Sequence, residues 1–254
     1  MDSEKNYENL VAYRVIAQFY DKLMGGNKYP GWKDLIADVV EKYNIAKGTC
    51  LDIACGTGNI SKLLIELGFK VVGLDISSEM VSIATQKFPE EQFVCADSRN
   101  FNLGDHSKSI TLAVSFYDSL NYLLSDDDML QAFKSVNRNL PVGTIFLFDM
   151  NPTDHIETAQ KFKPRVFEEA EFYSIFRFGG EGRFWTLDID LFLKNGECYR
   201  LIKERHVERG YNKEDIVPML ERAGFNLLEV REEHKTYEDG KKHLSRLYFI
   251  AQKA

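Results

Sequence analysis

One aspartate and two glycines near the start of the chain have the types and spacing of a ligand-binding site. Asp52 stands in the short apolar run Cys50–Ile53, and Gly56 and Gly58 follow in a stretch of small residues. The apolar run suits a buried strand, and the small residues suit a tight turn with exposed backbone. From Asn59 onward, apolar residues recur at helical spacing. In an open parallel sheet this pattern places the turn at the carboxyl end of the strand, where ligands bind.

The residues around the glycines narrow the kind of ligand. No lysine follows them, so the turn is not a Walker loop. The dinucleotide fingerprint needs a third glycine, and Ser61 occupies that position. A carboxylate at Asp52 would repel phosphates, but it suits a ligand that carries an ammonium group.

The stretch resembles motif I of the class I S-adenosylmethionine-dependent methyltransferases, Leu-Asp-x-Ala/Gly-x-Gly-x-Gly, with Ala54 where many members have a first glycine. The resemblance implies an α/β, Rossmann-like, doubly wound and mostly parallel seven-stranded sheet whose last strand is antiparallel. It also implies S-adenosylmethionine as the cofactor, with its methionine end against Asp52 and the glycine turn. The matching core is expected over residues 45–163 and 212–254.

Two further aspartates follow predicted strands and can reach the same ligand. Asp75 ends the strand Lys70–Asp75, 17 residues after Gly58. A carboxylate there can accept paired hydrogen bonds from the two hydroxyls of a ribose. Asp97 follows the strand Gln92–Cys95. The resemblance places Asp97 near the exocyclic amine of the adenine, and a turn or capping aspartate is the alternative.

The remaining cofactor contacts are expected from the ends of the first four strands and from the N-terminal segment. Met80 either lies against the adenine, as the resemblance suggests, or is a core methionine at helical spacing. The predicted cofactor-binding residues are Tyr20, Trp32, Asp52, Ala54, Cys55, Gly56, Gly58, Asp75, Ile76, Met80, Ala96, Asp97, Ser98 and Phe116.

Two amphipathic helices are predicted before the glycine turn, over Tyr7–Met24 and Trp32–Tyr43. Many class I methyltransferases carry an N-terminal helical cap over the cofactor, so we expect residues 1–44 to form one. The resemblance implies that Tyr20 reaches the methionine end of the cofactor and that Trp32 helps to cover the cleft. Both aromatic residues can instead be anchors of the core.

The acceptor side is expected after the fourth strand, Ile110–Phe116, an almost unbroken apolar run. The phrase Tyr117–Leu123, YDSLNYL, resembles a variant of the small-molecule branch that includes sugar and amino-acid N-methyltransferases. This position lies beside the transferred methyl group in class I enzymes. Each polar residue here can instead be a loop or capping residue, so no catalytic base is assigned. The acceptor-side candidates are Tyr117, Asp118, Asn121, Tyr122 and, from a later segment, His206, for which a surface strand position is the alternative.

No metal site is expected. Asp126, Asp127 and Asp128 are consecutive, but Ser125 before them suits a helix N-cap, and a helix N-terminus favours acids in its first turn. The four cysteines and five histidines lack the spacing of metal ligands.

The segment Pro164–Tyr211 interrupts the core with alternating aromatic or branched and polar residues. Asn195-Gly196 is a strong hairpin signal within it. We expect three antiparallel strands, Val166–Phe178, Arg183–Lys194 and Cys198–Glu208. The resemblance to sugar and amino-acid N-methyltransferases implies that residues 164–211 close the substrate side of the cleft; a dimerisation or edge-covering sheet is the alternative, and both can be true. One apolar face, offered to the acceptor side or to a second subunit, should include Phe167, Phe172, Phe176, Phe184 and Tyr199.

The charge composition of the chain limits the kinds of molecule that it can bind. The net charge is -7 and no long basic run is present, which argues against binding nucleic acid through its phosphates. No signal peptide or membrane-spanning segment is evident, so we expect a cytoplasmic protein, monomeric or homodimeric.

The expected activity is methyl transfer to the amine or hydroxyl of a small molecule. The alternatives are a tRNA-directed methyltransferase and a non-catalytic protein that binds S-adenosylmethionine. The sequence names no particular acceptor.

Overall fold

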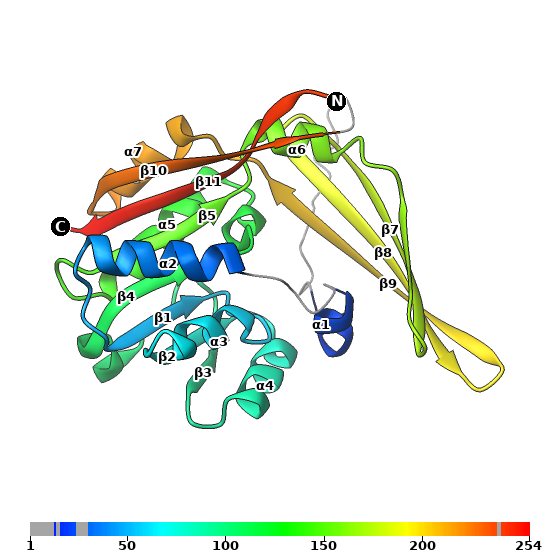
Figure 1. The fold of residues 1–254 in the computed structure, drawn as a ribbon, viewed down its shortest axis with the longest axis horizontal. Helices are drawn as coiled ribbons and strands as arrows, with labels where there is room; N and C mark the ends of the chain where they lie inside the picture. Colours follow the sequence, from blue (N-terminus) through cyan, green and yellow to red (C-terminus); the bar gives the residue numbers. More distant parts are fainter. Residues whose placement is uncertain (1–12, 14–15, 24–29, 238–239) are drawn as a thin grey trace.

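The computed structural model describes residues 13, 16–23, 30–237 and 240–254 (Figure 1). Within them, a seven-stranded sheet has the order β10-β11-β5-β4-β1-β2-β3. Only β11 in this sheet runs antiparallel to its neighbours, β5 and β10. The predicted Rossmann-like sheet with an antiparallel last strand is therefore confirmed. Its strands are β1 (Thr49–Ile53), β2 (Lys70–Asp75), β3 (Gln92–Cys95), β4 (Ile110–Ser115), β5 (Ile145–Met150), β10 (Phe225–Thr236) and β11 (Lys242–Lys253).

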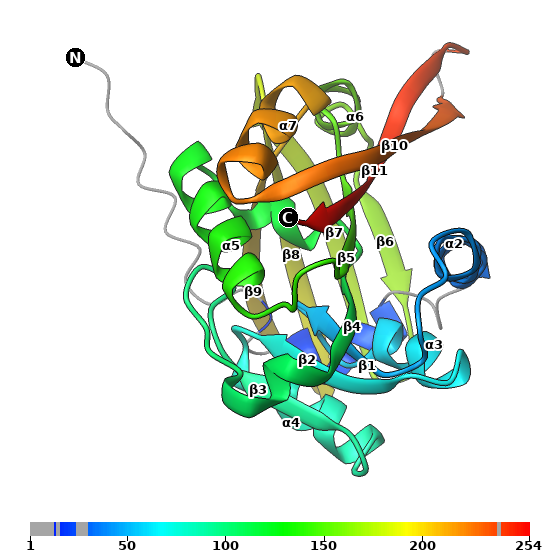
Figure 2. The same ribbon diagram turned by 90° about the vertical axis from the view of Figure 1, so that its left-hand side faces the viewer.

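The central strands are apolar because helices cover both faces of the sheet (Figure 2). On one face, α5 (Asp126–Arg138) and α7 (Lys213–Arg222) pack over β5 and β4. On the other face lie α2 (Pro30–Lys42) and α3 (Asn59–Glu66). The helix α4 (Ser78–Lys87) follows β2 and packs near β3. The connections between the first strands thus place all their carboxyl ends at one edge of the sheet.

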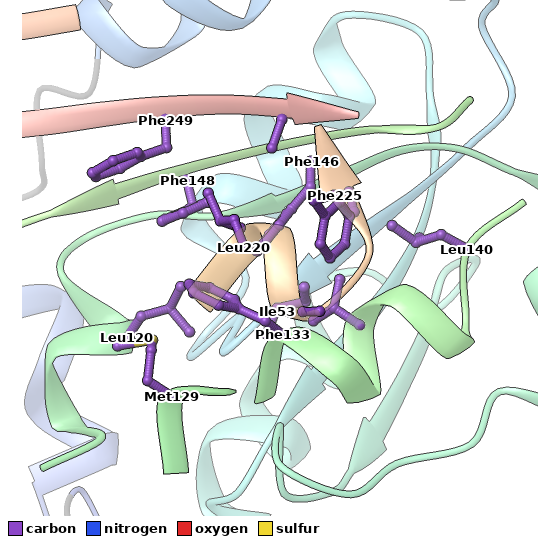
Figure 3. Packing of buried hydrophobic residues seen from close by; sticks show 14 of the residues in the cluster. Ile53, Leu120, Met129, Phe133, Leu140, Phe146, Phe148, Leu220, Phe225 and Phe249 are labelled. Carbon is purple, nitrogen blue, oxygen red and sulfur yellow. The ribbon is translucent and has the colours of Figure 1, made fainter. Parts of the chain in front are cut away.

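Phenylalanine rings fill the core beneath α5 and α7 (Figure 3). Phe148 of β5 stacks on Phe249 of β11, with ring centroids 5.0 Å apart. It also stacks on Phe146 at 4.7 Å and contacts Phe133 of α5 at 5.4 Å. Because Phe148 is fully buried, it joins β5, β11 and α5 into one packed unit.

The insertion forms a second antiparallel sheet, of four strands rather than the three expected, within the described residues (Figure 1). The expected strand Val166–Phe178 is broken by a turn, in which Glu169 N donates to Phe172 O at 2.9 Å. The four strands are β6 (Arg165–Glu168), β7 (Phe172–Glu181), β8 (Phe184–Asn195) and β9 (Cys198–Arg209). A helix that the sequence did not indicate, α6 (Thr153–Ala159), packs between β11 and strands β7 and β8.

Most of the helix expected over Tyr7–Met24 lies outside the described residues. The described part is a short 3₁₀ turn, η1 (Ile16–Phe19), followed by α1 (Tyr20–Leu23). Tyr13 has a φ of 70°, so a single helix does not run through it. Two further 3₁₀ turns, η2 (Gly104–Ser109) and η3 (Ser119–Tyr122), lie in the loops around β4. No described helix has the length and apolar character needed to cross a membrane.

Replacement of Phe148 by alanine should destabilise the protein by about 3–5 kcal/mol, because it removes a buried ring from a core that cannot fully collapse around the cavity. Urea unfolding followed by circular dichroism measures the change. Val142→Ala, at a side chain that is 76% exposed, is the control and should change the free energy of unfolding little. A loss of under about 1 kcal/mol for Phe148→Ala would contradict this packing.

Candidate functional site

A cavity of about 600 Å³ lies at the carboxyl ends of β1 to β4. The N-terminal segment also contributes to its wall, through Tyr13 and Tyr20. Its polar groups come from four separate loops, which only the parallel sheet brings together. The lining residues are Tyr13, Tyr20, Ala54, Gly56, Leu74, Asp75, Ile76, Met80, Ala96, Asp97, Ser98, Arg99, Tyr117, Ser119, Leu120, Tyr122, Leu123, Leu124 and Asp128.

The turn after β1 presents bare backbone to this cavity. Ala54, Gly56 and Gly58 all have positive φ, at 57°, 54° and 82°. A Cβ on Gly58 would lie 2.9 Å from the ring of Phe88, so glycine is required there for packing. A Cβ on Gly56 would meet no protein atom within 4 Å, because that side of the turn faces the cavity. A ligand can therefore approach the main chain closely at Gly56.

Asp75 ties two of the loops together. Its Oδ2 accepts a hydrogen bond from Gly56 N, and its Oδ1 accepts one from Ser77 N, both at 2.9 Å. Burial raises the pKa of the Asp75 carboxyl, and the backbone donors oppose that shift. Each oxygen keeps a further lone pair, and the side chain lines the cavity. Asp75 can therefore position the glycine turn and accept hydrogen bonds from a ligand.

At the other end of the cavity, Asp97 is fixed by Arg99. The guanidinium hydrogen-bonds both oxygens of Asp97, with Nη2 to Oδ2 at 2.6 Å, and it also reaches Asp128 at 2.8 Å. The hydrogen bond from Arg99 lowers the pKa of Asp97 below its usual value. Asp128 also belongs to the first turn of α5, where its backbone N–H donates to the N-cap Ser125. No three His, Cys, Asp or Glu side chains among the described residues gather as a metal site.

A second cavity, of about 430 Å³, adjoins the first. The two share Tyr13, Tyr117 and Tyr122 in their walls. On its far side lie apolar side chains of the four-stranded sheet, namely Phe167, Phe172, Phe176, Phe178 and Leu187. The hydroxyls of Tyr13 and Tyr122 hydrogen-bond each other at 2.7 Å, and Tyr122 reaches His206 Nδ1 at 3.0 Å. These side chains form the boundary between the two cavities.

The loop after β4 is held in an unusual backbone conformation. Tyr117 and Asp118 are consecutive non-glycine residues with positive φ, at 68° and 51°. Asp118 N donates to Asp149 Oδ1 at 3.0 Å, and Arg246 Nη2 donates to Asp118 Oδ1 at 3.0 Å. The same arginine also forms an ion pair with Asp149. Such strain persists only where surrounding contacts impose it, and it concentrates at functional sites.

Comparison with known proteins accords with this arrangement. A family model described as a methyltransferase domain matches residues 50–143. The protein YqeM of Bacillus subtilis (strain 168), which carries the name of a methyltransferase, is 35% identical over 249 residues, covering 95% of this chain and 97% of YqeM. The chain belongs to the class I S-adenosylmethionine-dependent methyltransferases.

A solved structure and a more distant relative extend this methyltransferase assignment. An S-adenosylmethionine-dependent methyltransferase from Clostridium acetobutylicum ATCC 824 superimposes with a TM-score of 0.79, at 28% identity, covering 95% of this chain and 99% of that one. A Streptomyces venezuelae protein is 28% identical over 125 residues, about half of each chain. It is named as the N,N-dimethyltransferase of dTDP-3-amino-3,4,6-trideoxy-alpha-D-glucopyranose.

Most of the residues predicted for the cofactor line the first cavity of the methyltransferase. Asp52 does not, because it is fully buried behind the turn, where it accepts a hydrogen bond from Ser61 Oγ at 2.6 Å. Trp32 instead packs against Phe116 and Tyr117, outside the cavity wall. The predicted residues that line the cavity are Tyr20, Ala54, Gly56, Asp75, Ile76, Met80, Ala96, Asp97 and Ser98; those that do not are Trp32, Asp52, Cys55, Gly58 and Phe116.

The acceptor-side candidates divide in the same way. Tyr117 and Tyr122 line both cavities, and Asp118 lines the second. Asn121 is fully buried. Its Nδ2 donates to the backbone carbonyl oxygens of Asn151 and Arg209, and its Oδ1 accepts a hydrogen bond from Asn151 N. Asn121 thus joins the loop after β4 to the ends of β5 and β9 instead of facing an acceptor. His206 is 1% exposed; it hydrogen-bonds Tyr122 and packs against Tyr13, so it contacts the boundary of the cavities without lining either one.

Three residues at the site depend on pairing between elements that are distant in the sequence, and none of them was predicted. Tyr13 lines both cavities, Glu208 lines the second, and Arg246 holds Asp118. Glu208 shares the sheet face of His206, two positions away, so strand alternation from His206 was the available signal. Arg246 lies in the last strand, and no pattern in the sequence pairs it with Asp118.

Asp75→Ala should weaken S-adenosylmethionine binding by about tenfold or more, because a charged acceptor is lost and the Gly56 N–H loses its partner. Titration calorimetry measures the affinity. Asp34→Ala, at an exposed residue of α2, is the control and should leave it unchanged. Equal affinities in Asp75→Ala and the wild type would remove Asp75 from the site.

Asp52 should make stability depend on pH. Burial raises its pKa from 3.8 to about 7. The folded state therefore keeps a proton that the unfolded chain releases, so this contribution is present below about pH 4 and is lost as the pH rises through about 7. Between about pH 4 and about pH 7, the free energy of unfolding should fall by on the order of 3 kcal/mol more in the wild type than in Asp52→Asn. Urea unfolding at both pH values tests the difference, and parallel pH profiles would contradict it.

Proposed function

We propose that this methyltransferase transfers a methyl group from S-adenosylmethionine to the nitrogen of a small molecule bound in the second cavity. The observation that carries the proposal is the boundary between the two cavities, where Tyr13, Tyr117 and Tyr122 line both. A cofactor in the first cavity and an acceptor in the second would meet at these side chains. The name of the Streptomyces venezuelae relative supports nitrogen as the methylated atom.

The first cavity suits S-adenosylmethionine in size and in chemistry. Its volume of about 600 Å³ can enclose a nucleoside joined to an amino acid. We infer that Asp75 accepts hydrogen bonds from the ribose hydroxyls, and that Ile76 and Met80 flank the adenine. Ile76 is 56% exposed although it is apolar, and a flat ring bound beside it would cover that surface.

The methionine end is assigned to the turn after β1. Gly56 gives a close approach to the backbone there, and Tyr20 lines the same cavity from α1. Asp52 is assigned a positioning role, because its carboxyl group holds Ser61 at the start of α3 from behind the turn. The Asp97–Arg99 pair lies where it can contact the adenine edge.

When bound, the cofactor supplies an electrophilic methyl group on a sulfonium, which is a good leaving group. The residues of this chain then need only hold the acceptor in line with that group and exclude water. The aromatic wall of the insertion and the three tyrosines can do both. The proposed roles require no metal ligand, so activity should persist in EDTA.

The test is a screen for S-adenosylhomocysteine release with amines, amino sugars and their hydroxyl counterparts, each with and without EDTA. Turnover of an amine, with none of its hydroxyl counterpart, supports nitrogen methylation. Turnover of the hydroxyl compounds alone would contradict it, and turnover only with added magnesium would contradict the metal-independent mechanism.

Phe167→Ala should impair turnover of any acceptor that the screen finds, because it removes part of the second cavity's wall. The acceptor's KM should rise several-fold while S-adenosylmethionine affinity is kept. Tyr199→Ala is the control, since that aromatic residue of the same sheet is 49% exposed and outside the cavity. If both variants alter only the oligomer's mass and leave the kinetics unchanged, the sheet is an interface and not a wall of the acceptor site.

A further inference from the structure

The second cavity carries charges of both signs toward solvent but only acids in its interior. Lys22, Arg165 and Glu169 line it and are exposed. The side chain of Asp118 is 15% exposed, and Glu208 is 2% exposed. An acceptor that enters beyond the exposed residues therefore meets two carboxyl groups and an aromatic wall.

Too little positive charge lies against these carboxyl groups. Arg246 forms ion pairs with Asp118, at 3.0 Å, and with Asp149. Glu208 accepts a hydrogen bond from Asn151 Nδ2 at 3.3 Å. Among the described residues of this network, three carboxyl groups share one guanidinium. Because a buried carboxylate without a cation is unfavourable, the network can gain stability from a positively charged ligand.

A hydrogen-bond donor is missing at the same place. Asn151 is 4% exposed, and its Oδ1 has no donor among the described residues. This oxygen belongs to the amide that donates to Glu208, so it lies beside the carboxyl pair. Asn151 lines neither cavity, so its oxygen lies behind the wall, and it shows that this end of the network is short of donors. A group with N–H donors and a positive charge complements the two carboxyl groups that line the cavity.

We propose that Glu208 and Asp118 bind the amino group of the methyl acceptor as an ammonium ion, and that Glu208 takes its proton. This inference rests on the proposed function, because it assigns the acceptor to the second cavity. An ammonium nitrogen has no lone pair and cannot be methylated until it loses a proton. In the proposed step, an N–H bond of the acceptor breaks, its electron pair stays on nitrogen, and an O–H bond forms on the Glu208 carboxylate. The electron pair of the neutral amine would then form the N–CH₃ bond while the S–CH₃ bond of a bound S-adenosylmethionine breaks and S-adenosylhomocysteine leaves, and Glu208 would release its proton to water.

The surroundings of Glu208 make its carboxylate a stronger base than that of an exposed glutamate. Burial raises the pKa of Glu208 well above its usual value, and the neighbouring Asp118 raises it further. A carboxylate with a raised pKa is a stronger base. A bound ammonium ion lowers that pKa again, so acceptor binding should release a proton from Glu208. The other titratable or charged groups of this network are Tyr13, Asp118, Tyr122, Asp149, His155, His206 and Arg246.

The test uses benzylamine and benzyl alcohol as a matched pair of probes for an aromatic cavity with an acidic interior. Both are titrated calorimetrically into the protein saturated with S-adenosylhomocysteine. The wild type should prefer benzylamine, and the preference should grow as the pH is raised and Glu208 loses its proton. E208Q should lose about tenfold in benzylamine affinity, as expected for a hydrogen bond to a charged group, and should lose the pH dependence. Its affinities for benzyl alcohol and S-adenosylmethionine should be unchanged.

E197Q, at an exposed glutamate between β8 and β9, is the control and should behave as the wild type. Wild-type titrations in two buffers of different ionisation enthalpy give a second measurement that does not depend on the variant's folding. They should show proton release when benzylamine binds. Equal binding of the two probes, a preference retained in E208Q, or no proton release would each overturn the inference and leave the proposed function standing. If neither probe binds, the acceptor site and the inference both fall.

Discussion

The buried ion cluster around Arg246 is the constraint on which the site depends. Arg246 of β11 pairs with Asp149 at the end of β5 and with Asp118 in the loop after β4. A buried charge must be paired, so these three elements cannot separate without a large cost in free energy. The cluster therefore holds Tyr117 and Asp118 in their strained backbone conformations and fixes the boundary between the two cavities. It also brings the antiparallel last strand, far away in the sequence, into contact with the site.

In the first cavity, a single side chain also holds two loops in place. The carboxylate of Asp75 accepts hydrogen bonds from the backbone N–H groups of Gly56 and Ser77. This side chain therefore fixes the turns after β1 and β2 relative to each other. Asn121 does the same for the loop after β4 and the ends of β5 and β9. Each of these side chains uses hydrogen bonds that a loop backbone would otherwise leave unmade. The loops are thereby positioned before any ligand arrives, which lowers the cost of ordering them on binding.

The insertion separates two tasks within one chain. The parallel sheet supplies the groups that suit a cofactor, and the four-stranded sheet supplies an aromatic wall that the core lacks. Because the insertion lies beyond β5, its side chains can vary without disturbing the glycine turn.

The sequence by itself determined the parallel core, because each of its signals is local. Strand limits such as Lys70–Asp75 and Gln92–Cys95, the caps at Ser77 and Ser125, and the glycine turn all follow from neighbouring residues. Tertiary structure decided which side of each element faces the ligand. Asp52 and Asp75 look alike in sequence, yet one lies behind the turn and the other lines the cavity. No pattern in the sequence pairs Arg246 with Asp118, and strand alternation places Glu208 on the face of His206 without showing what that face contacts. Both roles depend on strands β11 and β9 meeting the loop after β4, and contacts between elements so far apart in the chain cannot be read from local periodicity.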